Sequence, residues 1–220
     1  MTEVTEALAK IMLDMGTFRF RPDDPVVWAS GYTMPVYNDN RLLLSYPEAR
    51  ALVVQGFSEI LERWGCEVSA IVGTATAGIA PATSLADALG KRLYYVRSGS
   101  KDLGLGRQVE GVDREPRGRV LLVEDLVSTG GSSAEAALAV HNAGLTLNHG
   151  VAIFSYGFER ADDRFASLPF DFVLEPVVEL GTLLRIASQQ SLLDSEQIEV
   201  IESWIASPFE WGADRSGKGD

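Results

Sequence analysis

Residues 119–133 read RVLLVEDLVSTGGSS and carry the most informative pattern in the chain. The consecutive apolar residues Val120 to Val123 predict a strand that is buried on both faces. Two adjacent carboxylates, Glu124 and Asp125, end this strand, and a buried charge requires a partner such as a sugar diol or a hydrated metal ion. The small residues after them leave backbone N–H groups free to surround an anion at the start of a helix. This order of acids and amides suits a phosphorylated sugar.

A plainer interpretation of the same turn is that Ser132 caps a helix after an ordinary connection between strand and helix. Such a cap accounts for the serine. It gives no reason for two carboxylates at the end of a buried strand. We therefore favour a binding site for a phosphorylated ligand.

Strands and helices alternate on both sides of this stretch. We expect strands at residues 68–72, 93–97, 119–125, 150–156 and 170–175. We expect helices at residues 3–15, 79–89, 133–142, 179–190 and 195–206, the last with Asp194 as N-cap, and one more that a capping box at Ser45 and Glu48 opens and Gly65 ends. Apolar strands alternating with helices predict an α/β fold with a central parallel sheet covered by helices on both faces. Ligands bind such sheets at the carboxyl ends of the strands.

Two other turns lie at that edge of the predicted sheet. Residues 73–78 read GTATAG, which has the spacing of a nucleotide P-loop, but Ile79 and Ala80 stand where Lys and Ser or Thr are required. An NTPase is therefore disfavoured. The turn has two open interpretations: a tight structural connection, or a source of backbone amides for a second phosphate group.

Residues 98–118 follow neither a helical nor a strand period and contain five glycines. A segment of this length without regular structure in a small domain is typical of a lid or a binding loop, although a solvated surface loop is the plainer alternative. Gly104 and Gly106 lack a third glycine at the dinucleotide spacing, so a Rossmann fingerprint fails here. A lid would exclude water from a reaction whose intermediates hydrolyse.

The composition restricts partners and compartment. The chain has 220 residues, enough for one α/β domain, with 31 acidic and 19 basic residues and a net charge of −12. This surface repels nucleic-acid backbones and anionic lipids, so we expect no nucleic-acid partner and no membrane. Cys66 stands alone, which excludes an intrachain disulfide. No signal peptide or bilayer-length apolar run is visible, so we expect a cytoplasmic protein.

Residues 120–133 resemble the phosphoribosyl pyrophosphate (PRPP) motif of type I phosphoribosyltransferases, an apolar strand followed by two acids and a Thr-Gly turn. Further segments are similar to the orotate branch of that family: WASG at 28–31 continuing to PVYNDNR at 35–41, residues 73–81, and residues 95–111. The similarity extends from about residue 17 to residue 211.

The resemblance implies one phosphoribosyltransferase domain, residues 1–220. A small N-terminal hood at residues 17–45 would cover the base, a PRPP-binding α/β core would occupy residues 66–175, and residues 98–118 would be a mobile catalytic loop. The implied reaction transfers the phosphoribosyl group from PRPP to orotate, giving orotidine 5′-monophosphate and pyrophosphate in pyrimidine biosynthesis. Mg²⁺ as cofactor and a homodimer whose loop enters the partner's site are implied as well.

Carried over by position, the resemblance assigns Glu124 and Asp125 to the ribose hydroxyls, with Mg²⁺ held through PRPP and these carboxylates as further candidate ligands. Arg97 and Lys101, donated across the dimer, would neutralise the pyrophosphate, and with Asp125 they form the implied catalytic set. The implied PRPP-binding residues are Thr74, Ala75, Thr76, Ala77, Gly78, Arg97, Lys101, Glu124, Asp125, Leu126, Val127, Ser128, Thr129, Gly130, Gly131 and Ser132. The implied orotate-binding residues are Ser128, Tyr37 and Phe158.

Two other functions remain open. A phosphoribosyltransferase for another base shares the PRPP turn. A PRPP-sensing regulator would keep the fold without catalysis, and Leu103, at a position where many family members have His, favours that alternative. A regulator that binds nucleic acid needs a basic face, and the acidic composition argues against one.

Overall fold

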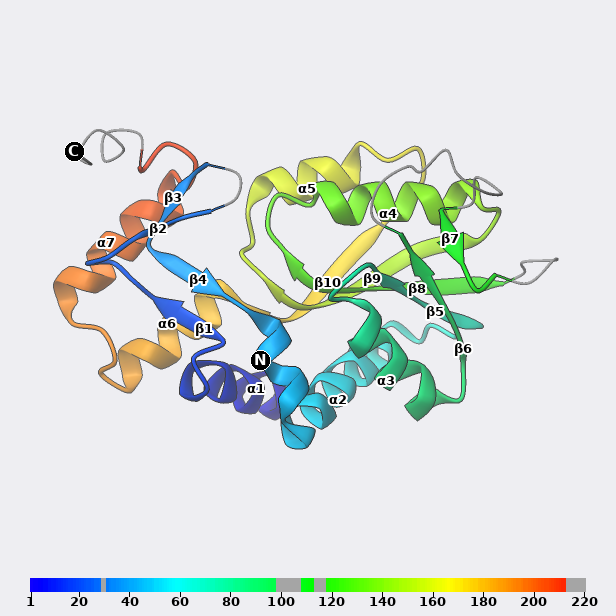
Figure 1. The fold of residues 1–220 in the computed structure, drawn as a ribbon, viewed down its shortest axis with the longest axis horizontal. Helices are drawn as coiled ribbons and strands as arrows, with labels where there is room; N and C mark the ends of the chain where they lie inside the picture. The colour runs from blue at the N-terminus through cyan, green and yellow to red at the C-terminus, as the bar shows by residue number, and fades with distance from the viewer. Residues whose placement is uncertain (29–30, 98–107, 113–117, 213–220) are drawn as a thin grey trace.

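The computed structural model describes residues 1–28, 31–97, 108–112 and 118–212. Within these residues the central sheet consists of β5 (Ala70–Thr74), β6 (Arg92–Val96), β7 (Val109–Glu110), β8 (Arg119–Val127), β9 (Thr146–Ser155) and β10 (Val173–Glu179). Their spatial order is β10–β9–β8–β5–β6–β7 (Figure 1). Neighbouring strands are parallel except β6 and β7, which are antiparallel. The predicted α/β class with a mainly parallel sheet is confirmed.

Helices cover both faces of this sheet (Figure 1). One face carries α1 (Glu3–Asp14), α2 (Pro47–Trp64) and α3 (Ile79–Leu89), and the other carries α4 (Gly131–Asn142) and α5 (Glu159–Ala166). Two C-terminal helices, α6 (Leu180–Gln189) and α7 (Ser195–Ala206), lie beside the N-terminal strands at one end of the molecule. Asp194 caps α7 in a capping box with Gln197, as predicted for Asp194.

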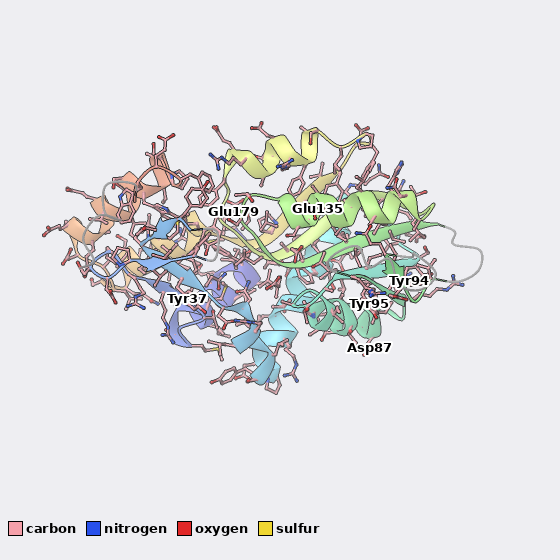
Figure 2. All side chains as sticks on the ribbon, turned by 45° about the horizontal axis from the view of Figure 1, so that its top comes forward. Tyr37, Asp87, Tyr94, Tyr95, Glu135 and Glu179 are labelled. Carbon is pink, nitrogen blue, oxygen red and sulfur yellow. The ribbon has the colours of Figure 1, made fainter. Side chains whose placement is uncertain are left out.

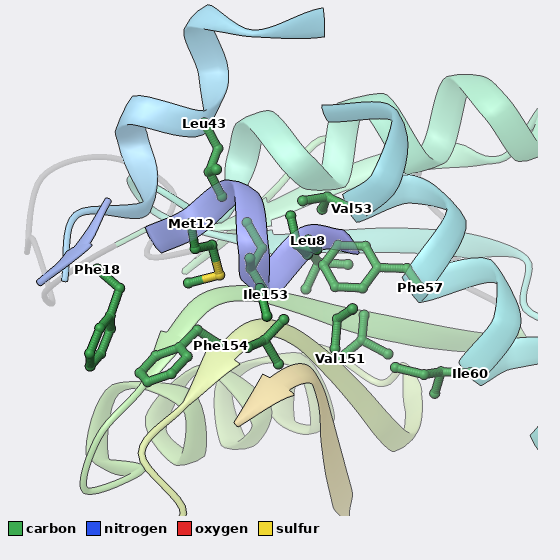
Figure 3. Close-up of a cluster of buried hydrophobic side chains, with 14 of the residues drawn as sticks. Leu8, Met12, Phe18, Leu43, Val53, Phe57, Ile60, Val151, Ile153 and Phe154 are labelled. Atoms are coloured by element: carbon green, nitrogen blue, oxygen red, sulfur yellow. The ribbon is translucent and has the colours of Figure 1, made fainter. Parts of the chain in front are cut away.

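Strand β8 separates two hydrophobic cores because successive side chains of a strand point to opposite faces. Leu121 and Val123 pack into the core beneath α1, α2 and α3, which Figure 3 shows in close-up. Val120 and Leu122 pack into the core beneath α4 and α5. These β8 side chains are all fully buried, which is why the strand reads as a continuous apolar run.

Residues 18–28 and 31–45 contain two small sheets and a short helix. Antiparallel β1 (Phe18–Phe20) and β4 (Val36–Asn38) place Arg19 opposite Tyr37, and β2 (Val26–Val27) pairs with β3 (Thr33–Met34). A 3₁₀ helix follows at Asn40–Ser45. The indole N–H of Trp204 in α7 lies 2.9 Å from the Met34 sulfur, so this region packs on the C-terminal helices. The hood and core boundaries expected from the sequence stay predictions.

The predicted capping box at the start of α2 is wrong. Ser45 ends the 3₁₀ helix, Tyr46 is the N-cap without a side-chain hydrogen bond, and Pro47 is the first helical residue. Proline disfavours helical geometry in the residue before it, so Tyr46 is extended (φ −118°, ψ 111°) and a helix cannot begin there. Gly65 ends α2 in a left-handed conformation, as expected.

Other differences follow from pairing and packing. Helix α5 was not predicted because its sequence is mostly charged and buries only Ala161 and Phe165. Strand β9 begins at Thr146, earlier than expected, because Arg119 of β8 pairs with Thr146. The first residues of β9 are mostly polar, so they show no apolar strand pattern in the sequence. Strand β10 starts and ends later than expected because its register follows β9, from Val173 opposite His149 to Glu179 opposite Ser155.

The segment 98–118 is described in part. Residues 98–107 and 113–117, and with them Lys101 and Leu103, lie outside the described residues. Val109 and Glu110 form β7 on the edge of the sheet, so the expectation of a segment without regular structure is wrong at these two positions. Among the described residues, no helix is both long enough and apolar enough to cross a membrane.

Candidate active site

The carboxyl ends of β5 and β8 bring three segments of the implied PRPP site together. Residues 74–77, Arg97, Glu124 and Asp125 line a cavity of about 440 Å³, here called the smaller cavity. Residues 38–41 close it from the N-terminal side. The side-chain amide of Asn40 donates a hydrogen bond of 2.7 Å to the backbone carbonyl of Asp125. The N-terminal region is therefore joined directly to the end of β8.

Glu124 is enclosed by hydroxyl groups and is only 5% exposed. The Thr74 hydroxyl lies 2.6 Å from its Oε1, and the Ser133 hydroxyl donates to its Oε2 at 3.1 Å. Thr74 Oγ1 also lies 3.2 Å from the carbonyl oxygen of Val123. Since a hydroxyl has one proton, Thr74 donates it to the nearer acceptor, Oε1 of Glu124, or to the carbonyl of Val123, but not to both at full strength. Both carboxyl oxygens of Glu124 thus accept hydrogen bonds from hydroxyl groups.

Burial is the largest influence on the pKa of each acid. Burial raises the pKa of Glu124 to about 7, and the nearby Asp125 charge adds to the rise, while the Thr74 and Ser133 hydroxyls oppose it. Burial also raises the pKa of Asp125, against the hydrogen bonds it accepts and the charge of Arg41. Glu124 is thus a group that exchanges a proton near neutral pH.

We expect the free energy of unfolding to fall as pH rises between 4.5, the ordinary pKa of glutamate, and about 7, its pKa in the fold. In this window the folded protein binds more protons than the unfolded chain, so raising the pH favours unfolding. Thermal unfolding of the wild type and of Glu124→Gln, at about pH 4 and about pH 8, measures the effect. The variant should lose less stability across this range. An identical pH dependence in both proteins would contradict the assignment.

The turn after β5 packs tightly against β8, which explains glycine at position 78. A β-carbon there would lie 2.6 Å from the carbonyl oxygen of Val123 and would also collide with Thr74. Ala75, Thr76 and Ala77 line the smaller cavity, and the Ala75–Thr76 peptide bond is cis. The turn suggested as a second anion-binding loop therefore lies beside the two acids.

The turn after β8 lies between two cavities. Ser132 lines the smaller cavity, whereas Ser128, Thr129 and Gly131 line a second one of about 1350 Å³, here called the larger cavity. Helix α4 begins at Gly131, not at the expected Ser133, and no side chain caps it. The plainer interpretation, with Ser132 as cap, is therefore wrong. The first N–H groups of α4 lack side-chain partners, which is the arrangement that binds anions.

Gly130 and Gly131 form a matched pair for testing this turn. Gly130 has φ of +73°, and a β-carbon there would lie 2.9 Å from Cα of Ala161 in α5, whereas nothing lies within 4 Å of one at Gly131. We expect Gly130→Ala to weaken PRPP binding at least about tenfold by distorting the turn, and Gly131→Ala, which keeps the backbone N–H and meets no described protein atom, to weaken it less. Calorimetric titration with PRPP measures both. Wild-type PRPP affinity in Gly130→Ala would refute this role.

The larger cavity contains two of the three residues implied for orotate. Tyr37, 40% exposed on β4 (Figure 2), and Ser128 both line it. Phe158 is 6% exposed and stacks on Tyr156 with ring centroids 5.3 Å apart. Tyr156 lines the cavity, whereas Phe158 is not among its described lining residues. The cavity wall is thus aromatic on this side.

Arg97 lies at the end of β6 and lines the smaller cavity of its own chain. Its Nη1 lies 3.2 Å from Oε1 of Glu110, and its backbone N–H donates to the Gln108 carbonyl at 2.9 Å. The short strand β7 thereby holds Arg97 beside the site. Lys101, the other implied pyrophosphate ligand, lies outside the described residues.

Comparison with known proteins identifies the family. No protein-family model matches the chain. The orotate phosphoribosyltransferase of Lactiplantibacillus plantarum is 40% identical over 214 residues, covering 96% of this chain and 99% of the relative. That of Bacillus subtilis is 37% identical over 203 residues, covering 92% and 93%. The chain belongs to the orotate phosphoribosyltransferase family.

A solved structure agrees with this assignment. The orotate phosphoribosyltransferase of Aeropyrum pernix superposes with a TM-score of 0.71 at 30% identity, covering 83% of this chain and 98% of that one. The predicted type I phosphoribosyltransferase fold is confirmed. As an orotate phosphoribosyltransferase, the chain is a pentosyltransferase of pyrimidine biosynthesis that forms orotidine 5′-monophosphate and pyrophosphate from orotate and PRPP.

Sequence reasoning missed several residues of this orotate phosphoribosyltransferase site. Ser133 contacts Glu124 from the first turn of α4, Asn40 contacts Asp125 across 85 positions of sequence, and Asn38 lines both cavities. The larger cavity is also lined by four arginines, which are Arg19, Arg21, Arg160 and Arg164. The sequence contains two signals for this. Arg19 and Arg21 are two positions apart, so they lie on one face of a strand. Arg160 and Arg164 are four positions apart, so they lie on one face of a helix.

Proposed function

We propose that PRPP spans the two cavities, with its ribose and pyrophosphate in the smaller cavity and its 5′-phosphate at residues 128–132. Orotate then occupies the larger cavity. The observation that carries this division is the position of the turn after β8, which lines both cavities and adjoins Asp125. Anion binding at the start of α4 fixes the phosphate end of the ribose, and the acids reach its hydroxyls.

Transfer at the anomeric carbon builds positive charge on the ribose ring, as in glycoside cleavage. Asp125, at the wall of the smaller cavity, stabilises that charge. Orotate is already an anion, so its attack needs little help from a general base. Arg97 and Lys101 stabilise the departing pyrophosphate, and closure of residues 98–118 keeps water from the ribose.

Magnesium is the proposed cofactor, and the donor set at this site determines how it is held. Mg²⁺ prefers oxygen ligands and usually retains several waters. In the described part of the chain no three His, Cys, Asp or Glu side chains converge, and both Glu124 oxygens already bond Thr74 and Ser133. The residues therefore fit an ion held mainly by PRPP oxygens, with Asp125 as a further carboxylate at the wall of the smaller cavity. When bound, it neutralises charge on the pyrophosphate.

The remaining assignments are a homodimer, with Arg97 and Lys101 serving the neighbouring site, and a cytoplasmic location without nucleic-acid partners. The net charge of −12 supports the absence of nucleic acid, and the resemblance supports the dimer. Because Arg97 lines the cavity of its own chain, donation across a dimer requires a direct test.

The function is tested by the loss of orotate absorbance when PRPP and Mg²⁺ are added to the purified protein. We expect stoichiometric pyrophosphate release that a metal chelator stops. Adenine and hypoxanthine in the same pyrophosphate assay test the alternative of another base. Tight PRPP binding without any product would instead favour the regulator.

A further inference from the structure

Two hydroxyl groups from different elements hold the carboxyl group of Glu124. Thr74 is the last residue of β5, and its hydroxyl lies nearer to Oε1 of Glu124, at 2.6 Å, than to any other acceptor among the described residues. Ser133 lies in the first turn of α4, and its hydroxyl donates to Oε2 at 3.1 Å. Both residues are buried. The carboxyl group is therefore fixed between β5 and α4.

These bonds leave one acceptor position of the Glu124 carboxylate open. A carboxylate has two oxygens with about four lone-pair positions in all. Oε1 accepts from Thr74 and, at 3.3 Å, from the backbone N–H of Asp125. Within the described residues Oε2 accepts from Ser133 alone. Since Glu124 lines the smaller cavity, the second lone pair of Oε2 is available to one hydroxyl of a ligand there.

The hydroxyl of Thr74 is fixed by its own packing. A β-carbon at Gly78 would lie 2.3 Å from Thr74 Oγ1, so the turn after β5 leaves just enough room for this hydroxyl. Threonine is also stiff at χ1 because it is branched at the β-carbon. Thr74 therefore holds Glu124 without having to be ordered when a ligand binds.

Ser133 joins the acid to the helix that begins at the phosphate turn. Helix α4 begins at Gly131 without a side-chain cap, and its first N–H groups are those proposed for the 5′-phosphate. Ser133 lies two residues further along the same helical turn. The orientation of Glu124 and the position of the phosphate donors therefore depend on one short piece of backbone.

The resemblance to phosphoribosyltransferases implies direct contact between Thr74 and PRPP, and the hydrogen bonds favour an indirect role. The Thr74 hydroxyl has a single proton, and Oε1 of Glu124 is its nearer acceptor. Phosphate oxygens are acceptors, so Thr74 has no second proton to donate to the pyrophosphate. Its effect on PRPP then passes through Glu124.

We propose that Thr74 and Ser133 are positioning residues that hold the open acceptor position of Glu124 toward one ribose hydroxyl of PRPP. This proposal rests on the assignment of the ribose to the smaller cavity. The neighbouring carboxylate of Asp125 serves the other ribose hydroxyl. An acid that is already oriented before the sugar arrives loses less freedom on binding, which strengthens the complex.

The first test removes each hydroxyl and keeps the shape of the side chain. Thr74→Val and Ser133→Ala should each raise the KM and the dissociation constant for PRPP at least about fivefold, with the KM for orotate unchanged. Thr74→Ser, which keeps a hydroxyl, should bind PRPP within about twofold of wild type. Thr83→Val on α3 is the matched control, because the Thr83 hydroxyl bonds the Ile79 carbonyl at 2.8 Å and Thr83 lines neither cavity.

The second test combines these variants with Glu124→Gln. By itself Glu124→Gln should weaken PRPP binding at least about tenfold, because an amide nitrogen replaces one acceptor oxygen. In that background Thr74→Val and Ser133→Ala should each weaken PRPP binding by a further factor below about two, because their effect passes through the lost carboxylate. Additive losses, as direct contact with PRPP predicts, would overturn the proposal. Unchanged PRPP affinity in Glu124→Gln would overturn it as well.

Thermal unfolding separates positioning from a merely structural role. A structural role predicts reduced stability with unchanged PRPP affinity, or equal rises in both KM values, and either result would overturn the proposal. If Thr74→Val does not fold, Ser133→Ala and its combination with Glu124→Gln decide the question. Turnover of orotate and PRPP binding by the wild type are measured alongside, so failure of the proposed function is seen separately.

Discussion

Replacement of Asp125 by asparagine should reduce turnover at least about a hundredfold while the protein stays folded. Asparagine has the shape of aspartate but lacks the charge that stabilises a positive ribose ring in the transition state. The backbone carbonyl of Asp125, which accepts the Asn40 hydrogen bond, is unchanged by this substitution. The fold and the contact with the N-terminal region should therefore persist.

The measurement is kcat with saturating orotate and PRPP, together with thermal unfolding to confirm the fold. Asp87→Asn is the matched control, because Asp87 is an exposed acid on α3 and lies outside both cavities (Figure 2). It should retain wild-type turnover. Near-normal kcat in a folded Asp125→Asn protein would remove Asp125 from the catalytic set.

The second large effect is recovery of activity in a mixture of two inactive variants. Lys101→Ala removes the loop cation, and Asp125→Asn removes the ribose anchor. If the loop of each chain serves its neighbour, a heterodimer of these variants contains one site with an intact loop and an intact anchor. Random exchange makes about half the dimers mixed, so roughly a quarter of wild-type activity per site should return.

The alternative is a loop that serves the site of its own chain. This alternative has support from Arg97, which lines the smaller cavity of its own chain. In that case every site of every dimer keeps one defect, and the mixture stays at the average of its parents. Mass spectrometry verifies that subunits have exchanged. No recovery in an exchanged sample would exclude the shared site.

The strand and turn around the acid pair were predictable from sequence because their causes are local. Consecutive buried side chains make β8 an unbroken apolar run, and the glycine at position 130 supplies the positive φ at which α4 begins. The same reasoning failed at Tyr46, where the restriction imposed by Pro47 outweighed the capping box. It also failed at α5, because this helix is mostly charged and buries only Ala161 and Phe165, which is too few apolar residues to show a helical pattern.

The lining of the site depended on chain segments that only folding brings together. Asn40 reaches the Asp125 carbonyl across 85 positions of sequence, and Thr74 reaches Glu124 across 50. The Arg160 guanidinium lies over the ring of Phe209, a residue beyond α7 that no motif marks. Local sequence patterns cannot predict such contacts, because each contact depends on the positions in the fold of two elements that are distant in sequence.

Sequence alone determined the α/β class, the acid pair at the carboxyl end of a buried strand and the amide turn behind it. These follow from side-chain periodicity, the cost of burying charge and the dihedral freedom of glycine, all of which act within a few residues. Tertiary structure decided that Glu124 is buried among hydroxyls with its pKa raised to about 7. It also decided which arginines face the larger cavity, because burial and electrostatic environment are properties of the packed chain.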